Sequence, residues 1–163
     1  MKFTKSYSLL IIVSIVFAAC KNNAYDSSIP NAPIYIRLDL SFHATQLNAP
    51  NENACFTEID VVKGVRNIGY GGVLIHSSPT SNINNLTGVD YSAFDMACPY
   101  EVDKTTRILP DESGMYAICE KCGSKFELTF GQIATKESLA KEILKRYNIS
   151  RSGNFLIVTQ RYN

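Results

Sequence analysis

Cys98-Pro99-Tyr100, followed by Cys119-Glu120-Lys121-Cys122-Gly123-Ser124-Lys125-Phe126, is the stretch that decides the fold of this 163-residue chain. It consists of two cysteine-bearing turns about twenty residues apart. Thiolates are ligands for soft transition metals. Two such turns at this separation can close on a metal site from both sides, so we expect them to meet at one end of a domain.

The two turns resemble the cluster-binding loops of the Rieske [2Fe-2S] domain, which read Cys-Pro-His and Cys-x-x-His-Gly-Ser-x-Phe. Positions 98, 99, 119, 123, 124 and 126 match that pattern. Both histidine positions differ, with Tyr100 at the first and Cys122 at the second. The resemblance implies a mostly-β, Rieske-like domain of short antiparallel sheets, with a cluster-binding subdomain at about residues 96–132.

The resemblance also assigns the iron ligands residue by residue. Cys98 and Cys119 take the cysteine positions on one iron, and Cys122 and the phenol of Tyr100 are left for the other. Neutral imidazole ligands give Rieske clusters raised potentials, about −150 to +300 mV against about −400 mV for all-thiolate clusters. An additional thiolate at Cys122 is therefore expected to lower the potential.

Three neighbouring positions support the ligands in this resemblance. Pro99 is expected to keep the first loop rigid, because its ring fixes φ. Gly123 is expected to let the backbone pass close to the cluster. Ser124 would donate its hydroxyl to a bridging sulfide, as the matching serine does in the family, or else would cap its own turn.

Four outcomes stay open for these cysteines. The first is a non-standard [2Fe-2S] cluster bound by Cys98, Cys119, Cys122 and an unusual fourth donor. The second is zinc, because Cys-x-x-Cys-Gly is also the form of a zinc knuckle. The third has no metal and a disulfide, for which the first choice is Cys98 to Cys119 and the other open pairings are Cys119 to Cys122 and Cys98 to Cys122. The fourth is a reactive Cys-x-x-Cys redox pair, although that motif normally opens a helix.

The N-terminus has the features of an export signal. Two lysines precede the apolar run at residues 9–16, which is too short to span a membrane. The ending Phe17-Ala18-Ala19-Cys20 resembles a bacterial lipobox, in which the cysteine receives a diacylglycerol and becomes the mature N-terminus. This resemblance implies a signal peptide at residues 1–19 and lipidation of Cys20.

The polar composition of residues 20–33 predicts a flexible, lipid-anchored tether. Residues 34–163 are predicted to form one domain. Loss of Lys2 and Lys5 with the signal peptide changes the net charge from +1 to about −1, so there is no basic field for nucleic acid. We expect a monomer held by its lipid at the bacterial cell envelope. No acidic residue follows Cys20 directly, which favours the outer membrane.

Period-two alternation predicts a half-buried strand at residues 34–42. Further strands are predicted at 54–62, 73–76, 91–95, 105–109, 114–118, 126–130, 148–150 and 155–159, with hairpin turns at Pro110–Gly114 and Arg151–Asn154. One short helix is predicted near residues 135–147, where Thr135 or Ser138 could cap an amphipathic segment.

The remaining candidate ligands lie outside the two turns. Cys55 is interpreted as a small hydrophobe, His76 as a core histidine and His43 as a loop residue. The sequence contains no carboxylate pair, hydrolase triad or phosphate loop, so substrate turnover is not expected. The function predicted is one-electron transfer to an envelope redox partner. The alternative is a cluster-free structural or binding lipoprotein on the same scaffold.

Overall fold

Residues Ile34–Asp39 form a strand in which buried and more exposed residues alternate. This is the pattern expected when one face of a strand packs on the core and the other faces water. The computed structural model describes residues 27–57, 67–82, 87–129 and 133–161. Within these ranges the strands are β1 (Ile34–Asp39), β2 (Glu52–Phe56), β3 (Asn67–Ile68), β4 (Val73–Pro79), β5 (Val89–Asp95), β6 (Ile108–Pro110), β7 (Tyr116–Cys119), β8 (Lys125–Glu127), β9 (Arg146–Ser152) and β10 (Phe155–Thr159).

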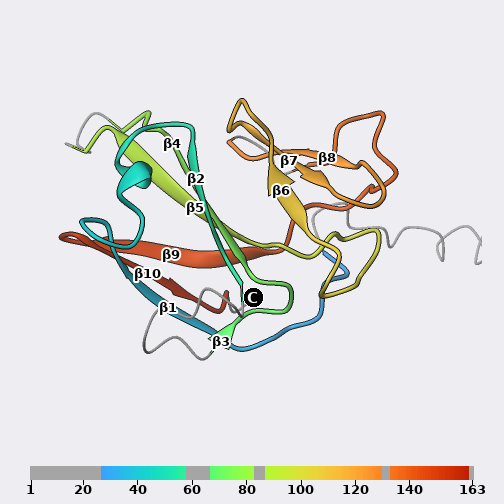
Figure 1. The fold of residues 1–163 in the computed structure, drawn as a ribbon, viewed down its shortest axis with the longest axis horizontal. Helices are drawn as coiled ribbons and strands as arrows, with labels where there is room; N and C mark the ends of the chain where they lie inside the picture. The colour runs from blue at the N-terminus through green and yellow to red at the C-terminus, as the bar shows by residue number, and fades with distance from the viewer. Residues whose placement is uncertain (1–26, 58–66, 83–86, 130–132, 162–163) are drawn as a thin grey trace, which may run out of the picture.

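Seven of these strands form one antiparallel sheet in the order β2-β4-β5-β9-β10-β1-β3. The sheet folds over, so that β2, β4 and β5 cross above β9, β10 and β1 (Figure 1). The fold-over occurs where β5 meets β9, a pairing of only two residue pairs, Ala93 with Tyr147 and Phe94 with Arg146. The main hydrophobic core lies on the inner face and includes Ile36, Leu38, Ile75, Ala93 and Leu156.

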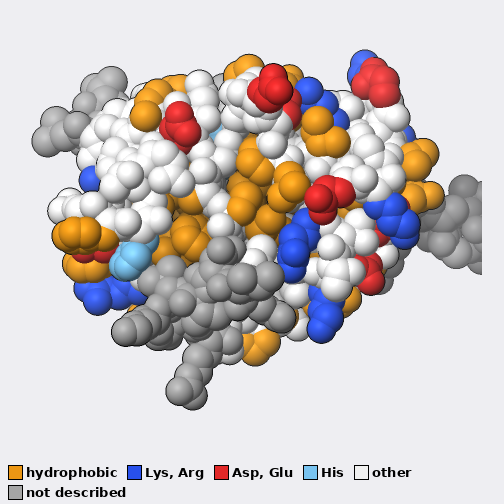
Figure 2. All heavy atoms as spheres, in the orientation of Figure 1, with side chains coloured by type: hydrophobic (Ala, Val, Ile, Leu, Met, Phe, Trp, Pro, Cys, Tyr) orange, Lys and Arg blue, Asp and Glu red, His pale blue; other side chains and the backbone are white. Residues whose placement is uncertain are grey.

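A smaller sheet carries the cysteine loops. It consists of β6, β7 and β8 in that order and lies beside β5 (Figure 1). A second hydrophobic core joins the small sheet to the outer face of β4 and β5, through Leu74 and Phe94 on one side and Phe126 and Leu128 on the other. Figure 2 shows hydrophobic side chains gathered at this junction, between β2 and β6. Both faces of β4 and β5 are therefore covered.

The predicted mostly-β class of short antiparallel sheets is confirmed, and the hairpin turn after Pro110 joins β6 to β7 as expected. The turn at residues 151–154 likewise joins β9 to β10. The strand predicted at 54–62 is observed as Glu52–Phe56, and residues 58–62 lie outside the described part of the chain. The described residues contain no helix with the length and hydrophobicity needed to cross a bilayer.

The helix predicted near residues 135–147 is wrong. This segment runs as turns and isolated bridges into β9, and the short helix found in the described part is a 3-10 turn at Thr45–Asn48. Hydrogen bonds to the small sheet explain the difference, because Thr135 donates its N–H to Lys125 and Ala140 donates its N–H to Ser124. These bonds hold the segment against the small sheet, with Leu139 at 55% exposure instead of on a buried helix face.

Residues 27–33, part of the predicted tether, pack on the domain. Ile29 is only 2% exposed. Ser28 donates hydrogen bonds to the Glu142 carboxylate from its N–H at 2.6 Å and its hydroxyl at 2.7 Å. Lys145 donates from its ammonium group to the carbonyl of Ile29 at 3.0 Å. The domain therefore begins before Ile34, whereas the signal peptide and Cys20 lie outside the described residues.

Candidate metal centre

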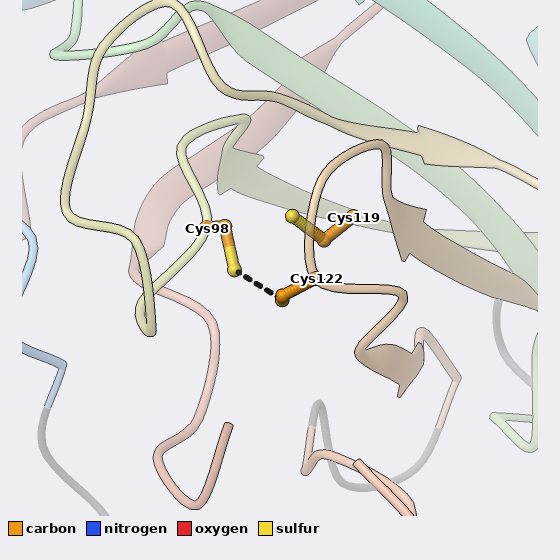
Figure 3. A group of neighbouring side chains, drawn as sticks. All are labelled: Cys98, Cys119 and Cys122. Carbon is orange, nitrogen blue, oxygen red and sulfur yellow. Dashed lines mark hydrogen bonds between the residues drawn. The ribbon is translucent and has the colours of Figure 1, made fainter. Parts of the chain in front are cut away.

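Three cysteine side chains converge from the two loops that the sequence singled out (Figure 3). Cys98 lies on the loop after β5, Cys119 is the last residue of β7, and Cys122 lies in the turn that leads to β8. Cys98 and Cys119 are buried, at 0% and 2% exposure, whereas Cys122 is partly exposed. The predicted meeting of the two turns is confirmed.

The three sulfur atoms all lie within 4.8 Å of one another. The Sγ atoms of Cys98 and Cys122 are 3.7 Å apart. Two sulfurs bound to one tetrahedral ion at about 2.3 Å are separated by roughly 3.7 Å. A disulfide requires about 2.05 Å, and all three side chains are free thiols. The first-choice disulfide between Cys98 and Cys119 is therefore not formed, and the three thiols lie close enough together to hold a metal ion.

The second loop is a tight turn closed by its own backbone. Cys119 accepts a hydrogen bond from the N–H of Gly123 at 3.1 Å, and its own N–H donates to the carbonyl of Ser124 at 2.9 Å. Gly123 has φ +69°, a conformation that side chains other than glycine adopt only with strain. Open space surrounds the position of its missing Cβ, so crowding by protein atoms does not explain the glycine. The required φ does explain it.

Ser124 links this turn to the segment before β9. Its side chain is fully buried, its Oγ accepts a hydrogen bond from the N–H of Ala140 at 3.0 Å, and it lies 3.1 Å from Cys122 Sγ. The serine therefore contacts a candidate ligand and also holds residues 135–147, the segment that was predicted as a helix. The sequence predicted a hydrogen bond from this serine to a bridging sulfide or a cap on its own turn, and neither of the two contacts seen here was predicted.

The first loop is held in a strained turn. Val102 donates its N–H to the carbonyl of Cys98 at 2.9 Å and has φ +48°. A β-branched residue rarely adopts positive φ, and such conformations cost about 1–3 kcal/mol. Pro99 is buried, whereas Tyr100 is 54% exposed. The loop thus buries its cysteine and presents its tyrosine to solvent.

An ion pair connects the two loops above the cysteines. The ammonium group of Lys121 lies 2.6 Å from the carboxylate of Glu101. The lysine side chain is 66% exposed, and the glutamate side chain is 12% exposed. Glu101 raises the pKa of Lys121, and Asp103 and Cys119 add to the rise. No local pattern indicates this pair, because the partners stand twenty residues apart.

A buried carboxylate fixes the start of the first loop. Asp95 ends β5 with 0% exposure. Its two oxygens accept four hydrogen bonds, from the hydroxyl of Tyr147 and from the N–H groups of Tyr70, Gly71 and Ala97. Burial raises the pKa of Asp95, while these bonds act in the opposite direction. The carboxylate thereby ties the glycine-rich turn at residues 69–72 and β9 to the chain that enters Cys98.

The thiols differ in how readily they ionise. Burial raises the pKa of Cys98 to about 12, and the backbone N–H groups of Glu101 and Tyr100 oppose that rise. Burial also acts to raise the pKa of Cys122, but hydrogen bonds with Ser124, Cys119 and Cys98 together outweigh it and lower the pKa. Cys122 is therefore an easier thiolate to form than Cys98.

The donor set fits a soft transition metal ion. Three thiolates around one point can bind zinc, iron or copper, and they are poor ligands for magnesium or calcium. In a two-iron cluster, Cys98 and Cys119 would hold one iron and Cys122 would hold the other. The 3.7 Å distance between the sulfurs of Cys98 and Cys122 is that of a hydrogen bond between thiols, and both lie within reach of one ion.

The other candidate ligands have partners elsewhere. His76 is fully buried, with Nδ1 3.0 Å from Asn53 Oδ1 and Nε2 3.3 Å from Thr129 Oγ1. His43 accepts a hydrogen bond at Nδ1 from the N–H of Asp39. Cys55 packs at the margin of the second core. None of the three belongs to the cysteine group.

Comparisons with protein-family models, curated proteins and solved structures found no match to this chain.

Proposed function

We propose that this chain is a Rieske-like metal protein of the bacterial cell envelope. In this proposal, Cys98, Cys119 and Cys122 bind one iron ion that carries one electron to an envelope partner. The observation that carries the proposal is the convergence of three sulfur atoms within 4.8 Å. Thiolate ligation allows iron to change its oxidation state while the surrounding loops keep the ligands in place.

The scaffold supports this role because protein contacts alone bring the three ligands together. The Glu101–Lys121 ion pair joins the loops, and hydrogen bonds fix the Cys119–Ser124 turn. Such an arrangement lowers the cost of ordering the ligands when the ion binds. The partly exposed Cys122 gives a redox partner an approach to the metal.

The envelope assignment is supported by the leader sequence. An apolar run followed by Phe17-Ala18-Ala19-Cys20 is typical of lipid-modified export. In this proposal the lipid on Cys20 anchors the domain, and the resemblance of the cysteine loops to Rieske loops gives the type of scaffold. The described part of the site contributes three thiols and one ion pair between the loops, a set that favours an electron carrier or binding module over substrate turnover.

The experiment is metal analysis of protein made anaerobically with sufficient iron and sulfide. We expect about one iron per chain, visible thiolate-to-iron charge transfer and a reversible one-electron step. Cys119→Ser should abolish the colour, whereas Cys55→Ser, outside the cysteine group, should retain it. Stoichiometric zinc would support the metal centre but refute the redox role.

Two further results would replace the proposed centre. Two irons with two acid-labile sulfides per chain would establish a [2Fe-2S] cluster in place of the single ion. A metal-free protein with one fewer pair of titratable thiols would establish the alternative, a cluster-free structural or binding lipoprotein with a disulfide. The 3.7 Å contact makes Cys98 to Cys122 the pair that this second result would identify.

A further inference from the structure

A cavity lies at the end of the large sheet where β3 pairs with the start of β1. Figure 1 labels both strands at this edge of the fold. The cavity has a volume of about 680 Å³, within the range of about 300–1,000 Å³ for small-molecule sites. Its described walls are residues 31–34, Asn67, Gln160 and Arg161. None of them belongs to the cysteine group, so the cavity is a second candidate site.

Amide side chains form much of the cavity wall, and one of them has an atom without a partner. Asn31 Oδ1 accepts hydrogen bonds from the ammonium group of Lys145 at 2.7 Å and from Gln160 Nε2 at 3.3 Å. Gln160 Oε1 is buried and has no hydrogen-bond partner within the described chain. Most buried acceptors in folded proteins have a partner. The described protein groups therefore do not satisfy this wall completely.

Three cations stand at this wall without a paired carboxylate. Arg161 lines the cavity, and Lys145 donates a hydrogen bond to the wall. Arg146, on β9, is close enough to Arg161 to interact with it electrostatically. The two ion pairs of the described chain lie in and beside the small sheet and include none of these cations. The carboxylate of Glu142, on the same segment as Lys145, accepts hydrogen bonds from Ser28 instead.

The two guanidinium groups lack a counter-charge. Arg146 is partly buried, and its pKa is lowered first by that burial and then by the positive charge of Arg161. No carboxylate counteracts these two effects on Arg146. Like charges that interact across a partly buried surface disfavour each other. An anion bound beside Arg161 would therefore stabilise both charged groups.

We propose that this cavity binds a small organic carboxylate. The guanidinium group of Arg161 can donate two parallel hydrogen bonds to the two carboxylate oxygens. A short apolar body packs on Ala32 and Pro33, and the amide side chains of the wall hydrogen-bond to its polar groups. Inorganic phosphate has no carbon body for the apolar part of the wall. This inference concerns a second site and does not depend on the metal centre.

The test uses the whole chain, with the signal peptide removed, labelled with ¹⁵N for NMR spectroscopy. Titration with N-acetylalanine should shift the side-chain amide signals of Asn31, Asn67 and Gln160 in a saturable manner. N-acetylalaninamide, which has the same body without the charge, should bind several-fold more weakly, and so should inorganic phosphate. The inference is overturned if millimolar N-acetylalanine does not shift these signals, or if the neutral amide or phosphate binds equally well.

Arginine variants identify the group that binds the carboxylate. Arg161→Gln should weaken N-acetylalanine binding several-fold and leave N-acetylalaninamide binding unchanged. Arg151→Gln is the matched control, because Arg151 is also exposed but lies at the other end of β9, where it donates to Tyr91. Arg161 is exposed, so its variant should keep the urea midpoint of the parent, and a loss of binding then reports the missing guanidinium group. Equal losses in the two variants, or no loss with Arg161→Gln, would overturn the inference.

Discussion

Asp95→Asn is the substitution that most directly tests how the first cysteine loop is held in place. The Asp95 carboxylate accepts four hydrogen bonds in a fully buried position, from one hydroxyl and three N–H groups. An asparagine has a single acceptor oxygen with two lone pairs. It can therefore satisfy two of these donors, and its own NH₂ group faces the other two.

The size of the effect follows from the unpaired donors. Each buried donor left without a partner costs about 1–3 kcal/mol, so two of them cost about 2–6 kcal/mol. For a domain of this size we expect the melting temperature to fall by about 5 to 20 °C. Removal of a buried charge offsets part of this cost, because burial raises the pKa of Asp95 and thus disfavours its ionised form.

Unfolding in urea at neutral pH, followed by far-UV circular dichroism, provides the measurement, because the chain contains no tryptophan. Asp90→Asn is the matched control, since Asp90 lies on the same strand but is exposed. Tyr147→Phe removes one of the four donors and should cost less than Asp95→Asn. If Asp95→Asn destabilises the protein no more than the Asp90 control, the carboxylate does not organise this loop.

Three other perturbations have defined outcomes. Burial lowers the pKa of His76 in the folded protein below 6.5. As the pH falls below 6.5, the unfolded chain takes up this proton before the folded protein does, so stability declines until the pH reaches the lower pKa of the folded state. His76→Gln should remove this part of the pH dependence of the urea midpoint. Gly114→Ala should destabilise the protein by at least about 1 kcal/mol, because φ is +71° and a Cβ would collide with the carbonyl oxygen of Asn51. Gly153→Ala, with positive φ but open space, should cost less in the same urea assay. Glu101→Gln should weaken Co²⁺ binding several-fold at low ionic strength and less at high ionic strength, because salt screens its pair with Lys121; equal losses at both ionic strengths would contradict an electrostatic role.

Local patterns in the sequence predicted most of the strands. The alternation in residues 34–42 marked β1, because one face of that strand is dry and the other is wet, but the strand ends at Asp39 and Phe42 is exposed. The turn at Pro110–Gly114 marked the β6–β7 hairpin, because its residues favour a reversal of the chain. In each case neighbours along the chain contain the information.

Long-range contacts explain what the sequence did not predict. Residues 135–147 have an amphipathic pattern, but hydrogen bonds from this segment to Ser124 and Lys125 outweigh its helix propensity. The same limitation applies to Asp95, whose four donors come from three separate parts of the chain. A charged residue at the end of an apolar strand was the available signal, and it does not identify the partners.

The cysteine group was predicted as a meeting of two turns, but its internal arrangement was not. The first choice paired Cys98 with Cys119, whereas the sulfur contact at 3.7 Å joins Cys98 to Cys122. Side-chain directions within the second turn decide this, and they depend on the positive φ at Gly123 and the hydrogen bonds that close the turn. Spacing along the sequence cannot give side-chain directions.

Because β4 and β5 are covered on both faces, they form a wall shared by the two cores. Neither sheet can open without uncovering apolar side chains of the other, so the two sheets should unfold together. In native-state hydrogen exchange, the amides around Leu74 and Phe94 should be the last to exchange. A ligand that stabilises the cysteine loops should slow exchange across this wall and in β2, whose Cys55 packs against the second core, although the ligand contacts neither.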